Sequence, residues 1–258
     1  MGTITKALEL LSHFSADRAE IGLAEFARLT SRDKATVHRH LNELCQNGFL
    51  EQAEDTGPYR LGPALSRLGH LRERTFPPRE AIMPIVRNLA TVTGELTHVA
   101  LFRDGTLTPI CHADMGVFGV RVTFDETEIL PLHATASGLA VLAFGPPEVF
   151  HRLQGHQMAR YTDQTETDAQ RLIALVETTR AQGYSVSDGY FEEDILALAA
   201  PVFDHEGLAM GAIAIAYPRA RAENRPAAPL LIQAAADITR TLGGALPDNI
   251  ERLWRTAA

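Results

Sequence analysis

The chain has 258 residues, enough for two domains of ordinary size, and its apolar (45%) and charged (22%) fractions are typical of a soluble globular protein. These proportions exclude a disordered chain, and no apolar run reaches the roughly 18 residues that a membrane span needs. The only two cysteines, Cys45 and Cys111, exclude a disulfide framework and a cysteine-rich zinc module, and they fit a cytoplasmic location. Residues 1–14 have the apolar spacing of an amphipathic helix and not the pattern of a secretory signal.

The net charge of −8 is distributed unevenly along the chain. Residues 1–75 contain ten Lys or Arg and ten Asp or Glu, so the whole net charge lies in residues 76–258. An acidic average argues against non-specific nucleic-acid binding by the larger part, but it is compatible with a local basic surface on the smaller part.

The first 62 residues predict three short helices followed by a β-hairpin. Apolar positions recur at helical spacing over residues 4–11, 23–29 and 33–46, and Gly48 stands where a helix-ending glycine is expected. Strands at 49–52 and 59–61 flank a turn-rich segment, residues 54–58. This order is that of a winged helix-turn-helix domain over residues 1–62. The alternative is a small helical domain that serves only for oligomerisation.

The third helix favours DNA binding over that alternative. With Val37 at the centre of the buried face, Leu41 and Leu44 fall beside it, as the helical step of 100° requires. Ala35, Arg39, Asn42 and Gln46 then point outward, with Thr36 and His38 on the flanks. Small, polar and cationic side chains on one face suit a helix that enters the major groove.

Residues 63–79 predict a linker helix that ends at the prolines near residue 77, and residues 80–258 predict one larger α+β domain. Asp104-Gly105 is a strong signal for a tight hairpin turn. We expect helices at 80–92 (interrupted by Pro84), 135–144, from 146, 168–182 and 229–242, and strands at 97–102, 106–111, 120–124, 184–186, 196–203 and 212–217. Hairpin strands with flanking helices indicate an antiparallel sheet.

Several motifs in this order resemble the IclR family of bacterial transcriptional regulators over essentially the full length. Lys34–Leu41 is similar to the family's recognition helix, and Tyr59–Gly62 to the end of its wing. The segments 130–138, 183–188 and 198–202 resemble its effector-domain signatures. The resemblance implies a homodimer or homotetramer that binds an operator with an inverted repeat, and a C-terminal GAF-like domain that binds a small-molecule effector.

The resemblance and the helix pattern together assign two sets of site residues. We expect Arg39 to face the major groove and Arg32, Lys34 and Arg60 to contact phosphates. The full predicted DNA-binding set is Arg32, Lys34, Ala35, Thr36, His38, Arg39, Tyr59 and Arg60. By position in the family, the effector pocket is walled by Ala136, Ser137, Gly138, Asp188, Ala197, Ala214 and Ala216.

Departures from the family pattern bear on the identity of the effector. The usual lysine after Gly138 is Leu139, and alanines stand at 197, 214 and 216 where some members carry cysteine or serine. Such a pocket should accept a larger, more apolar ligand, and we expect an aromatic or branched carboxylic acid. Its carboxylate would lie at the backbone amides near Ser137 and Gly138, in the first turn of a helix. Asp188 would either bind a ligand hydroxyl or anchor its own loop.

Other chemistries have weaker support in the sequence. His98, His112 and His133 could form a metal site with Asp188, but their spacing matches no local ligand motif. We expect each histidine to be a core or pocket residue that makes hydrogen bonds, and we expect no metal or cofactor. The sequence contains no nucleophile elbow, P-loop or dinucleotide fingerprint. Enzymatic activity is therefore not expected. The alternative function is a small-molecule-binding or metal-dependent protein whose N-terminal part only oligomerises.

Overall fold

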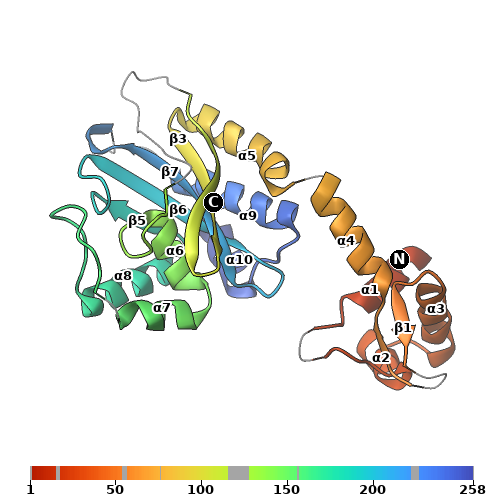
Figure 1. The fold of residues 1–258 in the computed structure, drawn as a ribbon. Coiled ribbons are helices and arrows are strands. Elements are labelled where there is room, and N and C mark those ends of the chain that lie inside the picture. Colours follow the sequence, from red (N-terminus) through yellow and green to blue (C-terminus); the bar gives the residue numbers. More distant parts are fainter. Residues whose placement is uncertain are drawn as a thin grey trace. The chain divides into compact units, whose positions relative to one another are not determined.

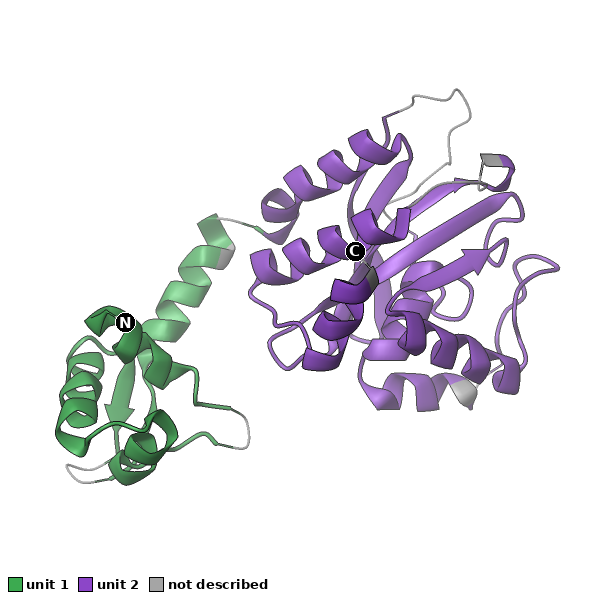
Figure 2. Cartoon of the chain, turned by 180° about the vertical axis from the view of Figure 1, so that it is seen from behind, with its two compact units in different colours: residues 1–77 green, residues 78–258 purple. Residues whose placement is uncertain are grey.

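A computed structural model describes residues 2–15, 18–53, 57–75, 77–115, 128–155, 157–221 and 227–257. The chain divides into two compact units, residues 1–77 and 78–258 (Figure 2). The helix predicted for the linker is grouped with the first unit. The predicted strand at 120–124 and most of the turn at 54–58 lie outside the described residues.

The first unit has the element order of a winged helix-turn-helix, which confirms the predicted fold. Its elements are α1 (Thr3–Leu11), α2 (Leu23–Thr30), α3 (Lys34–Gln46), β1 (Leu50–Gln52), β2 (Tyr59–Leu61) and α4 (Pro63–Thr75) (Figure 1). β1 and β2 pair antiparallel, with Glu51 opposite Arg60.

A small aromatic and aliphatic core holds the first unit together. Phe26 of α2 is fully buried, and the rings of Phe14 and Tyr59 meet it edge to face. The buried members of this core are Leu10, Ile21, Phe26, Val37, Leu41, Leu44, Leu50 and Tyr59. Helices α1, α2 and α3 and both strands therefore contribute to one core, which fixes the orientation of α3.

The second unit is built on a five-stranded antiparallel sheet with the order β4-β3-β7-β6-β5. The strands are β3 (Leu96–Arg103), β4 (Thr106–Ala113), β5 (Ser185–Asp188), β6 (Ile195–Phe203) and β7 (Ala209–Pro218). Asp104 and Gly105 both have positive φ angles, 51° and 83°, as a two-residue turn between β3 and β4 requires. The antiparallel α+β architecture predicted from the sequence is confirmed.

Helices cover both faces of the sheet (Figure 1). α5 (Pro78–Thr93) and α9 (Ala227–Leu242) pack on one face, and Pro84 lies within α5 without ending it. α6 (Ala136–Phe144) packs on the other face, and α7 (Pro147–Gln154) and α8 (Ala169–Gln182) pack against α6. A short 3-10 helix, η1, spans Arg219–Arg221, and a helix that was not predicted, α10, spans Asp248–Ala257.

Alanines bring α6 close to the sheet. A buried cluster joins α6 to β6 and β7 and consists of Ala136, Ala140, Ala199, Ala212 and Ala214. Small side chains on both surfaces shorten the distance between helix and sheet, because no larger side chain separates their backbones. The alanine-rich sequence of these strands therefore has a packing role as well as the predicted role in lining a pocket.

Candidate DNA-binding helix and effector pocket

The N-terminus of α3 begins at a defined cap. The Asp33 carboxylate accepts a hydrogen bond from the Thr36 backbone N–H at 2.9 Å. This bond lowers the pKa of Asp33 and satisfies one of the free amides of the first helical turn. The recognition-helix segment identified in the sequence therefore begins directly at Lys34.

The predicted faces of α3 agree with the burial of its side chains. Val37, Leu41 and Leu44 are buried, and His40 is buried beside them, which the helical pattern had not predicted. Burial, followed by the charges of Arg39, Arg32 and Lys6, lowers the pKa of His40. The residues expected to read DNA are exposed or half-buried: Lys34, Ala35, Thr36, His38 and Arg39.

Two of the predicted DNA contacts are placed elsewhere. The Tyr59 ring is only 1% exposed and belongs to the core, which it contacts through Phe26. The Arg32 side chain is 17% exposed, and its guanidinium pairs with the Glu9 carboxylate at 2.6 Å and donates to the Lys6 carbonyl. Arg32 therefore ties the turn before α3 to α1, and neither side chain lies on the α3 surface.

Arg60 remains on the surface of the wing. Its Nε atom lies 2.6 Å from Oε1 of Glu51 on the neighbouring strand, and its side chain is half exposed. A phosphate would have to compete with this carboxylate for the guanidinium.

A cavity in the second unit lies against the α6 face of the sheet. Residues directly opposite on antiparallel strands present their side chains to the same face. One row across the sheet reads Ser187, Ala197, Ala216 and Leu96, and the next reads Ser185, Ala199, Ala214 and His98. The first row forms the floor of the cavity, and Ala214 and His98 extend the floor toward α6.

The inner end of the cavity lies at the first turn of α6. Thr135, Ala136 and Ser137 line this end of the cavity, and the sequence analysis had placed Ala136 and Ser137 in the pocket wall. Gly138 does not line it, and its N–H is already bonded to the Thr135 hydroxyl at 3.0 Å. A Cβ atom at Gly138 would lie 2.4 Å from Leu132 Cα, so this glycine allows the preceding turn to pack tightly on α6.

His98 and Ser137 form a buried polar pair inside the cavity. His98 Nε2 lies 3.2 Å from Ser137 Oγ, and both side chains are more than nine-tenths buried. Burial, followed by the neighbouring His112, lowers the pKa of His98 to about 4. The imidazole is therefore neutral at pH 7 and offers the cavity a polar group without a charge.

Two carboxylates lie at the mouth of the cavity. Glu128 and Glu192 are exposed, and Phe191 and Ile195 line the wall beside Glu192. Partial burial, followed by the charge of Glu128, raises the pKa of Glu192. The cavity is open on this side, and apart from the two carboxylates its lining is mainly apolar.

Asp188 was predicted to belong to this pocket, but it does not line it. Its Oδ1 atom pairs with Arg219 Nε at 2.7 Å, and Arg219 also donates to the Glu193 carbonyl at 3.3 Å. This geometry corresponds to loop anchoring, one of the two roles considered for Asp188. The aspartate holds the segment that carries Phe191 and Glu192.

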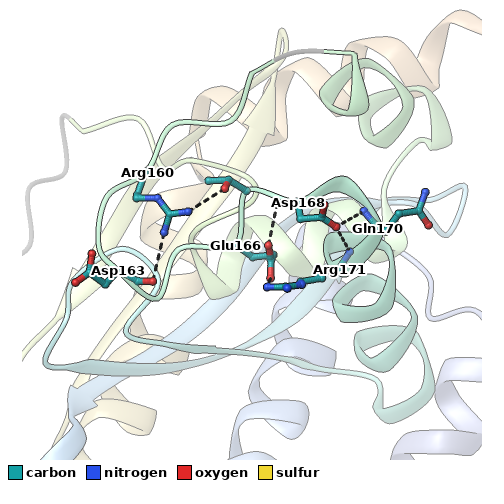
Figure 3. Close-up of polar contacts among 7 residues, drawn as sticks. Arg160, Asp163, Glu166, Asp168, Gln170 and Arg171 are labelled. Carbon is teal, nitrogen blue, oxygen red and sulfur yellow. Dashed lines mark hydrogen bonds and ion pairs between the residues drawn. The ribbon is translucent and has the colours of Figure 1, made fainter.

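A polar loop, residues 157–168, fixes the same segment from the other side. The hydroxyl groups of Thr162 and Thr165 donate to the carbonyls of Gly189 and Tyr190, and the Tyr161 ring lies 5.0 Å from the Phe191 ring. Hydrogen bonds within the loop hold it together: Arg160 donates to the Asp163 carbonyl and to the Thr167 hydroxyl. A second set of contacts joins the end of the loop to the start of α8 and involves Glu166, Asp168, Gln170 and Arg171 (Figure 3).

Of the histidines considered as metal ligands, His98 and His112 lie opposite each other on β3 and β4, and His133 comes from the turn before α6. His98 pairs with Ser137, and His133 Nε2 lies 2.8 Å from the Ala159 carbonyl. Within the described ranges, no three His, Cys, Asp or Glu side chains are grouped closely enough to hold a metal ion. Nor does any helix in the described part combine the length and apolar character needed to cross a membrane.

A winged helix-turn-helix unit with an exposed, cation-bearing α3 defines a DNA-binding transcriptional regulator. Comparison with known proteins specifies the class further. Residues 3–54 match the IclR helix-turn-helix domain, and residues 77–240 match the C-terminal domain of the bacterial transcriptional regulator IclR. The chain belongs to the IclR family.

Individual relatives cover nearly the whole chain. The HTH-type transcriptional regulator XynR of Escherichia coli is 26% identical over 93% of this chain and 97% of its own length. A crystal structure of an IclR-type regulator from Silicibacter sp. TM1040 is 38% identical, with a TM-score of 0.81 over 96% of this chain and 99% of its own. An IclR homologue from Microbacterium hydrocarbonoxydans, crystallised with 4-hydroxybenzoate, is 25% identical, with a TM-score of 0.59 over 94% of this chain and 99% of that one.

Proposed function

We propose that this regulator binds its operator through α3 and is controlled by a small organic acid, aromatic or branched, bound in the cavity of the second unit. It acts in the cytoplasm by binding and not by catalysis. The observation that carries the effector assignment is the cavity itself: its floor is apolar, and its inner end combines the first turn of α6 with the neutral His98–Ser137 pair.

The chemistry of the cavity suits a carboxylate attached to an apolar body. The first turn of a helix carries partial positive charge and backbone donors, so a carboxylate is favoured beside Ala136 and Ser137. The row of alanines and Leu96 gives the rest of the ligand an apolar surface. The 4-hydroxybenzoate bound by the Microbacterium homologue is a ligand of this kind.

The proposed DNA surface consists of the exposed residues on α3 together with the wing. Arg39 lies at the centre of the exposed face and would read base edges in the major groove, while Lys34 and Arg60 would contact phosphates. The first unit has no net charge, but Lys34 and Arg39 place two of its positive charges on the exposed face of α3. A local DNA-binding surface requires positive charge of this kind.

Exposed apolar side chains in the first unit support a homodimer. Leu68 and Leu71 on α4 are 40% and 51% exposed, and Ile4 and Leu8 on α1 are 76% and 51% exposed. Apolar side chains this exposed on two helices are typical of a surface that a second chain covers. A twofold dimer presents two α3 helices, so the operator should be an inverted repeat; a tetramer would pair two such dimers.

A titration on an isolated operator tests the proposal. Genomic fragments that bind the full-length protein are selected, and fluorescence anisotropy measures their affinity with and without benzoate, 4-hydroxybenzoate or 3-methylbutanoate. We expect at least one acid to change operator affinity about 5-fold or more, as expected for allosteric coupling energies. Absence of any DNA preference over random fragments would overturn the regulator assignment in favour of an oligomerisation unit.

A variant with a filled cavity, compared with a control variant outside the cavity, tests the position of the effector site. Ala197→Phe places a ring on the cavity floor and should abolish the response to the acid while operator affinity stays within twofold. Val186→Phe also introduces a phenyl ring, on the adjacent strand outside the cavity, and should leave the response unchanged. Ala214→Phe is less suitable, because Ala214 also packs in the alanine cluster beneath α6. A normal acid response in Ala197→Phe would contradict the proposed site.

A further inference from the structure

The charges at the cavity have one sign only. Within the described lining, Glu128 and Glu192 are the only residues that carry a charge at neutral pH, since His98 is neutral. Arg219, which contacts the segment that carries Glu192, pairs with Asp188 and does not line the cavity. A ligand with only a negative charge therefore gains no compensating ion pair from these lining residues.

The two carboxylates also act on each other. The charge of Glu128 contributes to the raised pKa of Glu192, so each negative charge makes the other less favourable. A positive group placed between them would remove this cost and gain two attractive interactions. A ligand hydroxyl could donate only one hydrogen bond and would leave both charges uncompensated.

The backbone on both sides of Glu192 is held in place before any ligand arrives. Thr162 and Thr165 bind the carbonyls of Gly189 and Tyr190, and Arg219 binds the carbonyl of Glu193 and the carboxylate of Asp188. A segment fixed on both sides of Glu192 loses little conformational freedom on binding, which is the condition for a selective contact.

We propose that the effector is an amino-substituted carboxylic acid whose protonated amine pairs with Glu192 and Glu128 at the mouth of the cavity. This inference rests on the proposed function, which places the carboxylate of the same ligand at the first turn of α6. The apolar floor formed by Leu96, Ala197 and Ala216 lies along the cavity, so an apolar body separates the two charged ends of the ligand. Glu192 is the residue that determines the specificity for the amine.

Matched ligand pairs test this inference. Calorimetry compares 4-(aminomethyl)benzoate with 4-methylbenzoate, and 6-aminohexanoate with hexanoate, on the full-length protein. In at least one pair we expect the amino compound to bind 10-fold or more tightly than its partner. Equal affinity within both pairs, or tighter binding of the compounds without an amine, would overturn the inference.

Variants of the two glutamates test whether the preference for the amine arises at the mouth of the cavity. Glu192→Gln keeps the shape of the side chain and removes its charge, and it should reduce the preference for the amine at least 5-fold while changing the affinity for the plain acid less than twofold. Glu193→Gln is the control, because the next residue in the same segment does not line the cavity. A preference that survives the double change Glu128→Gln and Glu192→Gln would contradict the assignment.

The two proposals fail in distinguishable ways. If the plain acids bind, Ala197→Phe abolishes that binding and no amine preference is found, only the present inference is wrong. If benzylamine binds while no carboxylic acid does, the carboxylate site at α6 is wrong and with it the proposed effector class. If no compound in the panel binds to the parent protein, both proposals are overturned for these ligand bodies.

Discussion

The two candidate sites of this regulator are assembled in opposite ways. The proposed DNA-binding surface comes mainly from one continuous helix, α3, whose exposed and half-buried residues lie within Lys34–Arg39, with Arg60 of the wing beside them in the proposal. The effector cavity comes from four strands, the first turn of α6 and two connecting segments, so its lining residues range from Leu96 to Ala216. A site on one helix can be derived from helical periodicity, whereas a site on a sheet depends on strand order and register.

The difference extends to the physical state of the residues. The α3 residues proposed to contact DNA are exposed or half-buried, so their charged and hydrogen-bonding groups already contact water. His98 and Ser137 are buried, and their protonation states and partners are set by the surrounding fold. Changes in the cavity should therefore affect stability as well as binding, while changes on the α3 surface should affect binding alone.

The largest expected effect concerns His98 and pH. Its pKa is about 4 in the folded protein and 6.5 for an unperturbed histidine. Between these values the unfolded chain binds the additional proton, so the free energy of unfolding should fall as pH decreases from about 6.5 toward 4. The contribution of this residue reaches about 3 kcal/mol at the acidic end of this window and vanishes above pH 7.

Urea unfolding followed by the fluorescence of Trp254 provides the measurement. This residue is the only tryptophan of the chain, and it is buried in the second unit. The acid-dependent loss of stability should be about 3 kcal/mol smaller in His98→Gln than in the parent, because the variant lacks the titrating group. Parallel pH profiles for the two proteins would show that His98 is not protonated on unfolding.

The second expected effect concerns the exposed face of α3. Arg39→Ala should weaken operator binding by about 1–3 kcal/mol and weaken binding to random DNA much less, since a base contact is sequence-specific. Anisotropy titrations on both DNAs measure the two losses. Arg171→Ala, an exposed arginine of the second unit, serves as the control and should change neither. Equal losses on operator and random DNA would make Arg39 a phosphate contact.

Much of the architecture could be predicted from the sequence because its signals are local. Asp33 and Gly48 mark the two ends of α3, and Asp168 and Gly183 mark those of α8. Asp104-Gly105 fixes the hairpin of β3 and β4. Each of these residues acts on its immediate neighbours, so its effect does not depend on the rest of the fold.

The missed helix α10 depends on distant partners. Trp254 packs against Phe203 of β6, and its indole N–H donates to the Gly183 carbonyl at 3.0 Å. The apolar spacing of Ile250, Leu253 and Trp254 is a helical signal, but it spans little more than one turn. Short helices of this kind are stabilised by tertiary contacts, which the sequence does not display.

The cavity was predicted only in part for a related reason. The family resemblance located Ala136, Ser137, Ala197, Ala214 and Ala216, which line the cavity. His98 was expected to be a core or pocket hydrogen-bonding residue without an assigned place in the pocket wall, and Glu128 and Glu192 had no assigned role in the pocket. The positions of His98 and Glu192 follow from the pairing of β3 with β7 and from the anchoring of the segment before β6, neither of which is encoded within a few residues.

The smallest effect concerns Arg32, which the sequence analysis expected to contact a phosphate. Arg32 precedes α3, but its guanidinium pairs with Glu9 at 2.6 Å, and both side chains are largely buried. Arg32→Ala should therefore cost the first unit about 1 kcal/mol of stability, because a charged hydrogen bond between helix α1 and the turn is lost. Hydrogen exchange of the first unit measures this loss, and a double-mutant cycle with Glu9→Ala should give a coupling energy of similar size.

Operator affinity of Arg32→Ala, measured well below the unfolding temperature, should stay within twofold of the parent. A uniform loss of affinity for all DNA, with a salt dependence reduced by about one phosphate contact, would instead return Arg32 to the DNA surface.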